Sequence, residues 1–356
     1  MGMRRHRQNL VVFGAALALG AVSLPARATV IGTVTANGYT FTNFDPTLVT
    51  GAAGSNANGI SNAGQVVGTQ VDANNASVFA NFAGTPTSLT ALNTGTGQVA
   101  FGINSAGNVV GGNGANAFYL PSGGSPQTIT VPGNAINAFG INDRSNIVGQ
   151  FTSGNATPGF YLPSATSGSF VTINAPNTAT GTNTVNAQGV NNNGLAIGFY
   201  LGNDGQVHGF QANTAGVAPG VAITSTAIAD PTIPAVPGEP GATFVFSQLL
   251  GINDNGLVSG YYGDSTTSQH GFLYNTAAGT YTFLDDPSEG FHNGVEVTQI
   301  TGITDAGELA GFYTDANGIA HSFVAVPAAV PEPASLALLG GGLLGLGLVR
   351  RRRKTV

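Results

Sequence analysis

Six copies of one ten-residue pattern recur along the chain, and they constrain its fold more than any other feature. The pattern reads Gly-Ile-Asn-Asp-x-Gly-x-Val-x-Gly, and its copies begin at Gly59, Gly102, Gly140, Gly189, Gly251 and Gly302. Their mean spacing is about 49 residues, which is typical of the repeats that form propeller blades. Such a repeat predicts one supersecondary unit per copy, with neighbouring units stacked to bury a shared core.

Each unit is expected to contain four β-strands. The Ile or Val after the first Gly ends one strand, and the Asx residues and Gly that follow form a tight turn. In the fifth unit the next strands are expected at residues 257–262, 270–274 and 281–287. Four strands per unit are typical of a propeller blade.

The last unit has no fourth strand of its own, because the chain passes from Phe323 into a linker at residues 326–329. A matching segment, residues 39–46, precedes the first copy and resembles residues 281–287 of the fifth unit. If this segment completes the last unit, no long strand edge stays open. The sequence therefore predicts an all-β fold, a six-bladed β-propeller closed by an N-terminal strand, with a β-solenoid as the alternative.

The N-terminus has the organisation of a secretory signal peptide. Its parts are a basic region with Arg4, Arg5 and Arg7, an apolar run at residues 10–24, and the cleavage pattern Ala26-Arg27-Ala28. Cleavage after Ala28 would start the mature chain at Thr29. We therefore expect a signal peptide (1–28), a propeller of six repeats (29–325), a linker with a Pro-Glu-Pro motif (326–333) and a hydrophobic segment with a basic cytoplasmic end (334–356).

The C-terminal segment is a second targeting element. The motif Pro331, Glu332, Pro333 precedes sixteen uncharged residues, 334–349, which are followed by the basic residues Arg350, Arg351, Arg352, Arg353 and Lys354. As a helix, the uncharged stretch would be about 24 Å long, against about 30 Å for a bilayer core. The basic cluster would stay on the cytoplasmic side and halt translocation. These physical features alone fit a plain C-terminal anchor equally well.

Taken together, the Pro-Glu-Pro motif, the hydrophobic segment and the arginine cluster resemble the PEP-CTERM sorting signal of Gram-negative bacteria. The resemblance implies processing by an exosortase-type enzyme and transient anchoring in the inner membrane through a hydrophobic sorting helix. It also implies delivery to the outer surface or the extracellular matrix, where exopolysaccharide is a candidate partner.

The charge of the chain is concentrated in its targeting segments. Between Thr29 and Val330 the only basic residue is Arg144, against fifteen acidic residues. A body with one cation cannot neutralise a run of phosphates, so nucleic-acid binding is excluded, and its acidity could instead attract divalent cations. The absence of cysteine excludes disulfides and thiolate metal sites.

The repeats also resemble the HAF family of extracellular repeats, which is named for a His-x-Phe element. The tripeptides that begin at His208, His270 and His321 match this element, whereas the first three copies lack the histidine. The resemblance covers about residues 59–324 and implies an extracellular setting, without any chemistry to transfer.

Two recurring sets of polar residues are candidates for chemistry. Asp143, Asp254 and Asp305 could act as paired carboxylates in glycan hydrolysis, and His208, His270 and His321 could form a three-histidine metal site. The Asp position is Asn or Ser in the other copies, an exchange that an Asx turn tolerates and an acid catalyst does not. The histidines recur once per unit, so symmetry would keep them apart. We therefore predict structural roles for both sets, and no catalytic, cofactor or metal site.

Two further features break the regularity. Acidic turns at residues 204–205, 254–256 and 315–318 offer weak calcium ligands, but none has the spacing of a dedicated loop. The longest interval, between the fourth and fifth copies, contains a Pro-rich insertion at residues 230–240, which could be a binding loop or a stiff solvated excursion. Glu289, His292 and Glu296 are polar residues outside the repeated pattern.

These observations predict an exported, non-enzymatic protein of the cell surface or extracellular matrix. The alternative is a propeller that uses one face to bind or process carbohydrate. Symmetry-breaking carboxylates or aromatic residues gathered on one face would distinguish the alternative.

Overall fold

The computed structural model describes residues 28–46, 54–72, 75–82, 85–89, 97–131, 133–165, 169–176, 183–235 and 239–329. All regular structure in these ranges is β-strand. Within them no helix is long and apolar enough to cross a membrane. The predicted signal peptide up to residue 27, the Pro-Glu-Pro motif and the predicted sorting helix lie outside the described residues.

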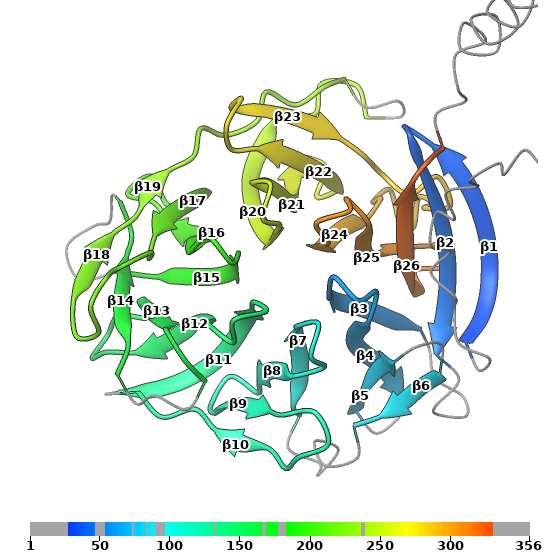
Figure 1. Ribbon diagram of the computed structural model, residues 1–356. Helices are drawn as coiled ribbons and strands as arrows, with labels where there is room; N and C mark the ends of the chain where they lie inside the picture. Colours follow the sequence, from blue (N-terminus) through cyan, green and yellow to red (C-terminus); the bar gives the residue numbers. More distant parts are fainter. Residues whose placement is uncertain are drawn as a thin grey trace, which may run out of the picture.

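The strands form five sheets that are arranged around a centre, so the fold is all-β and propeller-like (Figure 1). Three of the sheets are four-stranded, and in each the strands pair antiparallel in chain order. They comprise β3 (Ser55–Ile60), β4 (Val66–Asp72), β5 (Asn75–Phe82) and β6 (Thr85–Ser88); β15 (Val185–Val190), β16 (Leu195–Leu201), β17 (Val207–Asn213) and β19 (Thr226–Ala227); and β20 (Phe244–Ile252), β21 (Leu257–Asp264), β22 (Gln269–Asn275) and β23 (Thr280–Phe283).

A nine-stranded sheet contains the second and third repeats. Its strands are β7 (Val99–Ile103), β8 (Val109–Gly112), β9 (Ala117–Leu120), β10 (Gln127–Thr128), β11 (Asn134–Ile141), β12 (Ile147–Thr152), β13 (Gly159–Leu162), β14 (Val171–Asn174) and β18 (Ala222–Thr224). The two antiparallel groups, β7–β10 and β11–β14, are joined by one residue pair, Asn137 with Gly112. The short strand β18 comes from the fourth repeat and pairs parallel with β14, which links the third and fourth repeats.

The fifth sheet joins the two ends of the described chain. It contains β1 (Ala28–Ala36), β2 (Tyr39–Pro46), β24 (Thr298–Ile303), β25 (Leu309–Thr314) and β26 (Ala320–Pro327). Strand β2 pairs antiparallel with β26, so the predicted pairing of residues 39–46 with the last unit is confirmed. The sequence analysis did not foresee β1, which extends the sheet through an Asn37-Gly38 turn with both residues at positive φ.

The repeated pattern explains the local structure near the centre. The second motif residue ends the inner strand in all six copies, as predicted. Each inner strand also has a register shift, with a bulged residue just before the motif Gly, at residues 58, 101, 139, 188, 250 and 301. A β-bulge adds an unpaired residue and can redirect its side chain.

Glycine is required at two positions of the motif, at the last one by close approach and at the sixth one by turn geometry. A Cβ on Gly149, the last residue of its copy, would lie 2.6 Å from the Phe160 ring, and Gly311 meets Phe323 at the same distance. In the turn itself Gly256 has φ +75°, whereas the third copy has Ser145 there at φ +60°. The turn conformation is therefore kept even where the sequence departs from glycine.

The hydrophobic core lies between neighbouring sheets. One cluster packs Leu273 of β22 against Ile300, Leu309 and Phe323 of the next sheet, together with Phe41 of β2. Another cluster joins Ile197 of β16 to Leu249, Val258 and Phe272 of the sheet that follows. Each repeat therefore buries its apolar face only against its neighbours, as expected for stacked repeats.

Candidate functional site

A cavity of about 240 Å³ lies where the six inner strands meet. Its lining includes the six bulged residues, which are Asn58, Phe101, Phe139, Gln188, Leu250 and Thr301. These six side chains are amide, aromatic, aliphatic and hydroxyl groups, although the flanking motif residues hardly vary. The bulge thus directs the variable residue of each repeat to the centre, while the repeated residues maintain the scaffold.

The motif glycines surround this cavity and contact one another from repeat to repeat. A Cβ on Gly140 would lie 3.0 Å from the Cα of Gly189, and one on Gly251 would lie 2.9 Å from the Cα of Gly302. The last glycine meets the first, since a Cβ on Gly302 would lie 3.3 Å from the Cα of Gly59. Glycine at this position allows adjacent inner strands to approach backbone to backbone.

A second, smaller hollow of about 60 Å³ shares the β-branched residues of the motif with the main cavity. Here the third motif residue makes two kinds of hydrogen bond. The Oδ1 of Asn191 accepts from the Leu195 amide within its own turn, at 2.9 Å, while its Nδ2 donates to the Asn253 carbonyl of the next repeat, at 3.1 Å. Asn142 and Asn253 bond the next repeat in the same way, so this asparagine fixes both its turn and its neighbour.

The fourth motif residue forms a polar ring at the same end. Each backbone N–H donates to the side chain of the equivalent residue in the next repeat, in the order Ser105 to Asp143 (2.7 Å), Asp143 to Asn192 (3.1 Å), Asn192 to Asp254 (2.7 Å), Asp254 to Asp305 (2.7 Å) and Asp305 to Asn62 (2.7 Å). The sixth position of the ring has Ser105, whose buried Oγ has no hydrogen-bond partner within the part of the chain that the structure describes.

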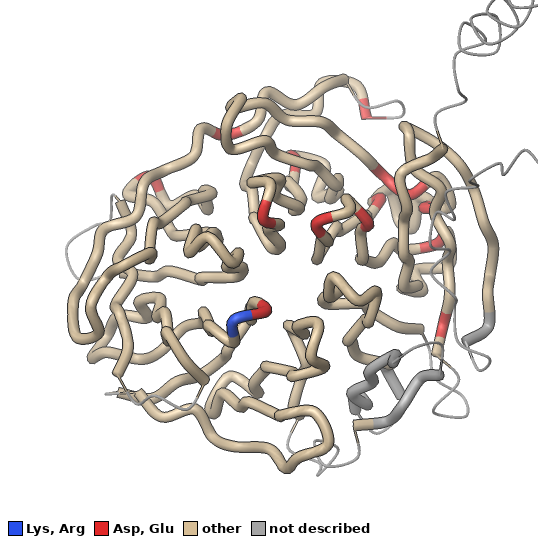
Figure 2. The backbone as a smooth tube through the Cα atoms, in the orientation of Figure 1, with Lys and Arg blue, Asp and Glu red and all other residues tan. Residues whose placement is uncertain are grey.

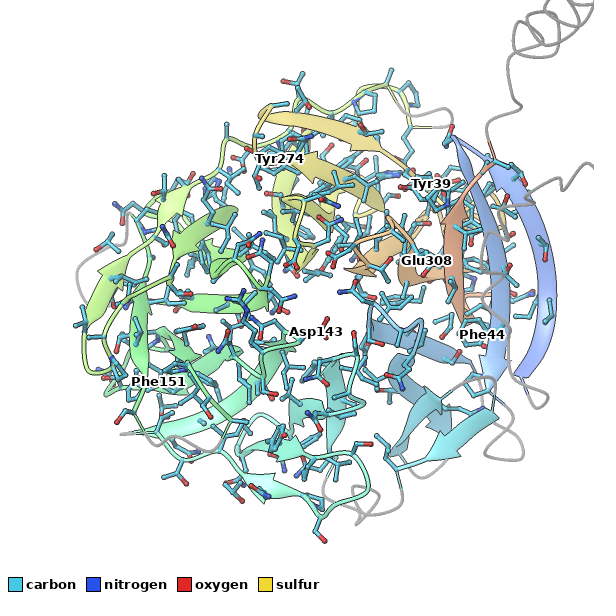
Figure 3. The ribbon with its side chains drawn as sticks, in the orientation of Figure 1. Tyr39, Phe44, Asp143, Phe151, Tyr274 and Glu308 are labelled. Atoms are coloured by element: carbon cyan, nitrogen blue, oxygen red, sulfur yellow. The ribbon has the colours of Figure 1, made fainter. Side chains whose placement is uncertain are left out.

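Asp143, Asp254 and Asp305 are therefore brought to one polar ring, where Asp143 lies near the centre of the molecule (Figure 3). Their carboxylates accept backbone hydrogen bonds from the preceding repeat, and the Nδ2 of Asn62 also bonds both Asp143 and Asp305. The predicted structural role fits this geometry, but the bonds run between repeats rather than within each residue's own turn.

The three histidines lie in three different sheets, on β17, β22 and β26. Each ring lies between two Asp carboxylates and beside a tyrosine ring at 5.1–5.7 Å. The Nδ1 atoms of His208, His270 and His321 face Asp230, Asp285 and Asp45 at 2.8, 3.0 and 2.8 Å. The Nε2 atoms face Asp204, Asp264 and Asp315 at 3.0, 3.7 and 3.6 Å. The structure thus does not assemble a three-histidine site.

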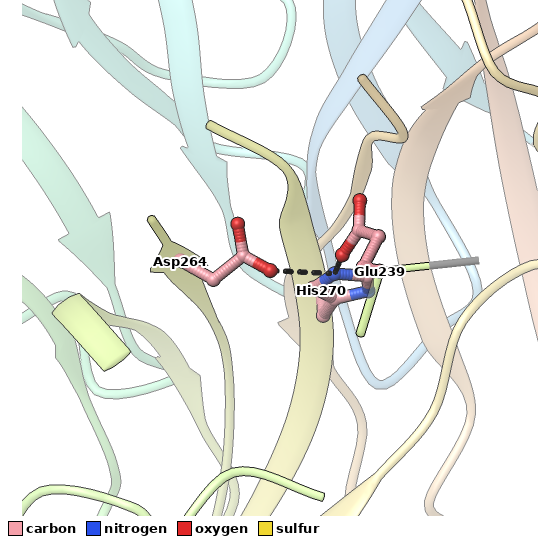
Figure 4. Close-up of side chains that lie close together, drawn as sticks. All are labelled: Glu239, Asp264 and His270. Atoms are coloured by element: carbon pink, nitrogen blue, oxygen red, sulfur yellow. Dashed lines mark hydrogen bonds and ion pairs between the residues drawn. The ribbon is translucent and has the colours of Figure 1, made fainter. Parts of the chain in front are cut away.

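The His270 position differs from the other two by a third carboxylate. Glu239 Oε2 lies 3.3 Å from His270 Nε2, and Asp264 Oδ2 lies 3.7 Å from the same nitrogen (Figure 4). All three residues are buried, with exposed fractions of 5% for Glu239, 3% for Asp264 and 1% for His270. One potential ligand atom from each lies within 4.8 Å of the other two. These residues could hold a metal ion, and we call them the Glu239–Asp264–His270 cluster.

The remaining polar atoms of the cluster are held by neighbouring groups. Asp264 Oδ1 accepts from the Thr266 amide at 2.9 Å, the Thr266 hydroxyl at 2.7 Å and the Ser268 amide at 3.2 Å. The Ser268 hydroxyl donates to Glu239 Oε1. Asp264 Oδ2, in contrast, is buried and has no hydrogen-bond partner among the described residues, although it lies 3.7 Å from His270 Nε2. His270 Nε2 also forms a hydrogen bond with Glu239 Oε2, at 3.3 Å, so these three atoms face one another.

Further carboxylates surround the cluster and perturb its ionisation. Burial lowers the pKa of His270, but the hydrogen bond and charge of Asp285, with the charges of Glu289 and Glu239, outweigh burial and raise it to about 9. Burial and the charge of Asp285 raise the pKa of Glu289 to about 9. Burial is also the main cause that raises the pKa values of Asp286 and Glu296. This part of the molecule therefore gathers acidic groups in a poorly solvated setting.

No sequence pattern identifies this cluster. Glu239 comes from the Pro-rich insertion, Asp264 from the end of β21 and His270 from β22, so no local spacing links them. Two features of the sequence could have indicated the cluster. One is the insertion itself, and the other is that it places an acidic residue just before a repeat that contains a histidine. The other irregular residues lie nearby in the chain: the Glu289 carboxylate accepts from the Thr298 hydroxyl at 2.6 Å, whereas His292 Nδ1 lies 3.3 Å from the Ala316 carbonyl oxygen.

The candidate calcium turns are held by internal hydrogen bonds. Asp315 accepts from the amides of Asn317 and Ile319, both at 2.9 Å, and Asp204 accepts from the Gln206 amide at 3.0 Å. Asp254 belongs to the polar ring. Because these carboxylates are used within turns or between repeats, the turns resemble ordinary Asx turns.

Comparison with solved structures gives remote similarities. A streptogramin B lyase structure is 13% identical over 80% of this chain and 97% of the other, at a TM-score of 0.39. TolB from Acinetobacter baumannii is 8% identical over 82% and 61%, at a TM-score of 0.33. An Aleuria aurantia lectin in complex with Fucalpha1-6GlcNAc is 10% identical over 83% and 94%, at a TM-score of 0.31. At these scores the similarities carry no argument about activity.

No curated protein matches the chain. The family comparison does find the PEP-CTERM protein-sorting motif at residues 329–353, a span that contains Pro331, Glu332, Pro333 and the arginines from Arg350 to Arg353. These sorting residues, like Ala26 of the predicted cleavage site, lie outside the described residues. The motif implies processing by an exosortase-type system, and the protein is therefore an exported one, sorted to the cell envelope or surface by a C-terminal PEP-CTERM motif.

Proposed function

We propose that this protein is a six-bladed β-propeller that acts without catalysis at the cell surface or in the extracellular matrix, associated with exopolysaccharide. The PEP-CTERM motif at residues 329–353 carries the proposal, because it directs the protein to that location. The HAF-like His-x-Phe elements at His208, His270 and His321 support an extracellular setting. The acidic body, with Arg144 as its only basic residue, suits solubility outside the cell.

Six blades are supported by features that recur six times. There are six motif copies, six bulged inner strands and six glycines that follow one another around the cavity. The contact of Gly302 with Gly59 and the pairing of β2 with β26 join the last repeat to the start of the chain. In this assignment the nine-stranded sheet is two blades that share one residue pair.

The first experiment measures the intact mass of the protein in each cell fraction of its native host. We expect a C-terminus near Pro333 in the outer-membrane or extracellular fraction. A variant with Arg350, Arg351, Arg352 and Arg353 replaced by Gln is expected to lose this processing, whereas Lys354→Gln alone serves as the control. A chain that runs through Val356 in the inner membrane would instead mean a tethered protein, and the matrix assignment would lose its support.

The central cavity favours one second candidate, a carbohydrate-binding propeller. The ring centroids of Phe101 and Phe139 lie 5.0 Å apart at the cavity, whose lining also contains the amide residues Gln188 and Gln248. Aromatic faces with convergent amides suit a neutral polar ligand such as a sugar. Binding of cell-surface glycans that falls at least tenfold in Phe139→Ala, but not in the exposed Val221→Ala control, would support this candidate. Equal binding by both variants would contradict it.

A further inference from the structure

We propose that the Glu239–Asp264–His270 cluster binds one divalent transition-metal ion, with Zn²⁺ as the ion that fits best. The ligand atoms are Glu239 Oε2, Asp264 Oδ2 and His270 Nε2 (Figure 4). This site is independent of the sorting function, and the sequence patterns did not predict it.

The spacing of the three atoms fits such an ion. His270 Nε2 lies 3.3 Å from Glu239 Oε2 and 3.7 Å from Asp264 Oδ2. Ligands at about 2.1 Å from a tetrahedral Zn²⁺ are about 3.4 Å from one another. One imidazole and two carboxylates leave the fourth position for water. A nitrogen ligand favours a transition metal over Ca²⁺ or Mg²⁺, which prefer oxygen.

The groups around the cluster orient its ligands. Asp285 Oδ2 lies 3.0 Å from His270 Nδ1, so Nδ1 can carry the proton and donate it in a hydrogen bond. Metal binding would displace the second proton from Nε2, whose lone pair then faces the two carboxylates. Asp285 is itself fixed, because its Oδ1 accepts from the Gly271 amide at 2.7 Å. A carboxylate that holds the second nitrogen of a histidine is the usual support of a metal-binding imidazole.

The unpaired oxygen of Asp264 is a second, independent observation that indicates a ligand. Its Oδ2 is buried without a hydrogen-bond partner, although the other oxygen accepts three hydrogen bonds. Leaving a buried carboxylate oxygen unpaired is costly, and carboxylates buried this deeply are usually paired or bound to metal. A divalent cation would both satisfy this oxygen and offset the two carboxylate charges.

The other two histidines provide an internal comparison. His208 and His321 have the same arrangement, with one Asp at Nδ1 and another at Nε2. In neither case do three ligand atoms lie within 4.8 Å of one another in the described part of the chain. They are also less buried, with side chains 16% and 13% exposed against 1% for His270. The Pro-rich insertion, by contributing Glu239, therefore distinguishes the His270 position.

The test uses the full mature chain after treatment with a chelator, and it measures Zn²⁺ binding by calorimetry and metal content by mass spectrometry. We expect one Zn²⁺ per chain. Glu239→Gln and His270→Gln are each expected to lower the affinity at least 100-fold. Asp285→Asn, which removes a positioning residue, should lower it about 10–100-fold. His208→Gln is the matched control, and it should bind as tightly as the wild type.

Three results would overturn the proposal: no stoichiometric Zn²⁺ binding by the wild type, equal losses in His208→Gln and His270→Gln, or Ca²⁺ that binds as tightly as Zn²⁺. A variant that fails to fold would be recognised by circular dichroism. X-ray absorption of the Zn²⁺-loaded wild type then provides a test that needs no variant. It should show one imidazole nitrogen and oxygen ligands at about 2.0–2.2 Å, and a zinc shell without imidazole would also contradict the assignment.

Discussion

The glycines around the central cavity make a quantitative prediction about Gly140→Ala. A Cβ on Gly140 would lie 2.5 Å from the Gln188 carbonyl oxygen and 3.0 Å from the Gly189 Cα, both backbone atoms of the next repeat. Ordinary contacts begin at 3.4 Å, so the oxygen would be about 0.9 Å too close. Because no side chain can rotate away, the neighbouring inner strand must shift.

The expected cost follows from two opposing effects. Overpacking in a well-packed region costs about 1–3 kcal/mol. The Gly→Ala change also restricts the unfolded chain and returns about 0.4–1 kcal/mol. The net loss of about 1–2 kcal/mol should lower Tm by about 2–4 °C for a body of this size. The assay is thermal unfolding followed by far-UV circular dichroism and tyrosine fluorescence, since the chain has no tryptophan.

Two matched variants make the result interpretable. Gly302→Ala meets its nearest atom at 3.0 Å, so it should cost less than Gly140→Ala, and Gly32→Ala meets nothing within 4 Å. Gly32→Ala should therefore be neutral or stabilising by up to about 1 kcal/mol. If Gly140→Ala is as stable as the wild type, or if Gly32→Ala loses as much, the close contact between inner strands is not what selects glycine.

The polar ring and the histidine pairs make two further predictions. Ser105→Asn should supply the long side chain that the sixth position of the ring lacks and raise the free energy of unfolding by about 0.5–1.5 kcal/mol; an unchanged denaturation midpoint would contradict this. The hydrogen bond that His321 Nδ1 donates to Asp45 is the main cause that raises the pKa of His321, so the folded state holds this proton more tightly than the unfolded state. The pair's contribution is therefore fully present below the unfolded pKa of about 6.5 and is lost as the pH rises through the folded pKa. His321→Gln should consequently destabilise the protein more at about pH 5.5 than at about pH 9, and an equal loss at both would refute the pairing.

The ends of the inner strands could be predicted because the same ten-residue motif recurs in each repeat. The Ile or Val after the first motif Gly ends the strand in every copy, and the turn residues that follow are those that favour a tight reversal. The strand at residues 39–46 could be found because it resembles the outer strand of the fifth unit. The bulges could not be predicted, since residues 58, 101, 139, 188, 250 and 301 share no side-chain chemistry. What they share is a shift in the pairing register of the backbone, and a pattern of side-chain types does not indicate such a shift.

The polar residues were harder to interpret than the strands. The exchange of Asp143 with Asn and Ser in other copies favours a structural role, but the hydrogen-bond partner lies in the next repeat rather than in the residue's own turn. Glu239 lies in an insertion without periodicity, so its approach to His270 depends on how the whole segment folds back. A repeated sequence pattern predicts contacts that occur in every repeat. A site that occurs in one repeat has no second copy in the sequence with which it can be compared.

The distribution of charge explains why a cation site would form in the fifth repeat rather than elsewhere. Twelve of the fifteen acidic residues of the body lie between Asp204 and Asp315, and the His-bearing repeats are the ones that contain them. Figure 2 shows most of the acidic positions on this side of the ring, whereas the described chain contains one basic residue, Arg144. In repeats four and six a histidine lies between two carboxylates, so an imidazolium leaves one carboxylate uncompensated. Repeat five adds Glu239 in a buried position, which leaves two carboxylates uncompensated there. A bound divalent ion would offset the charges of Glu239 and Asp264, because no Lys or Arg lies in this half of the described chain.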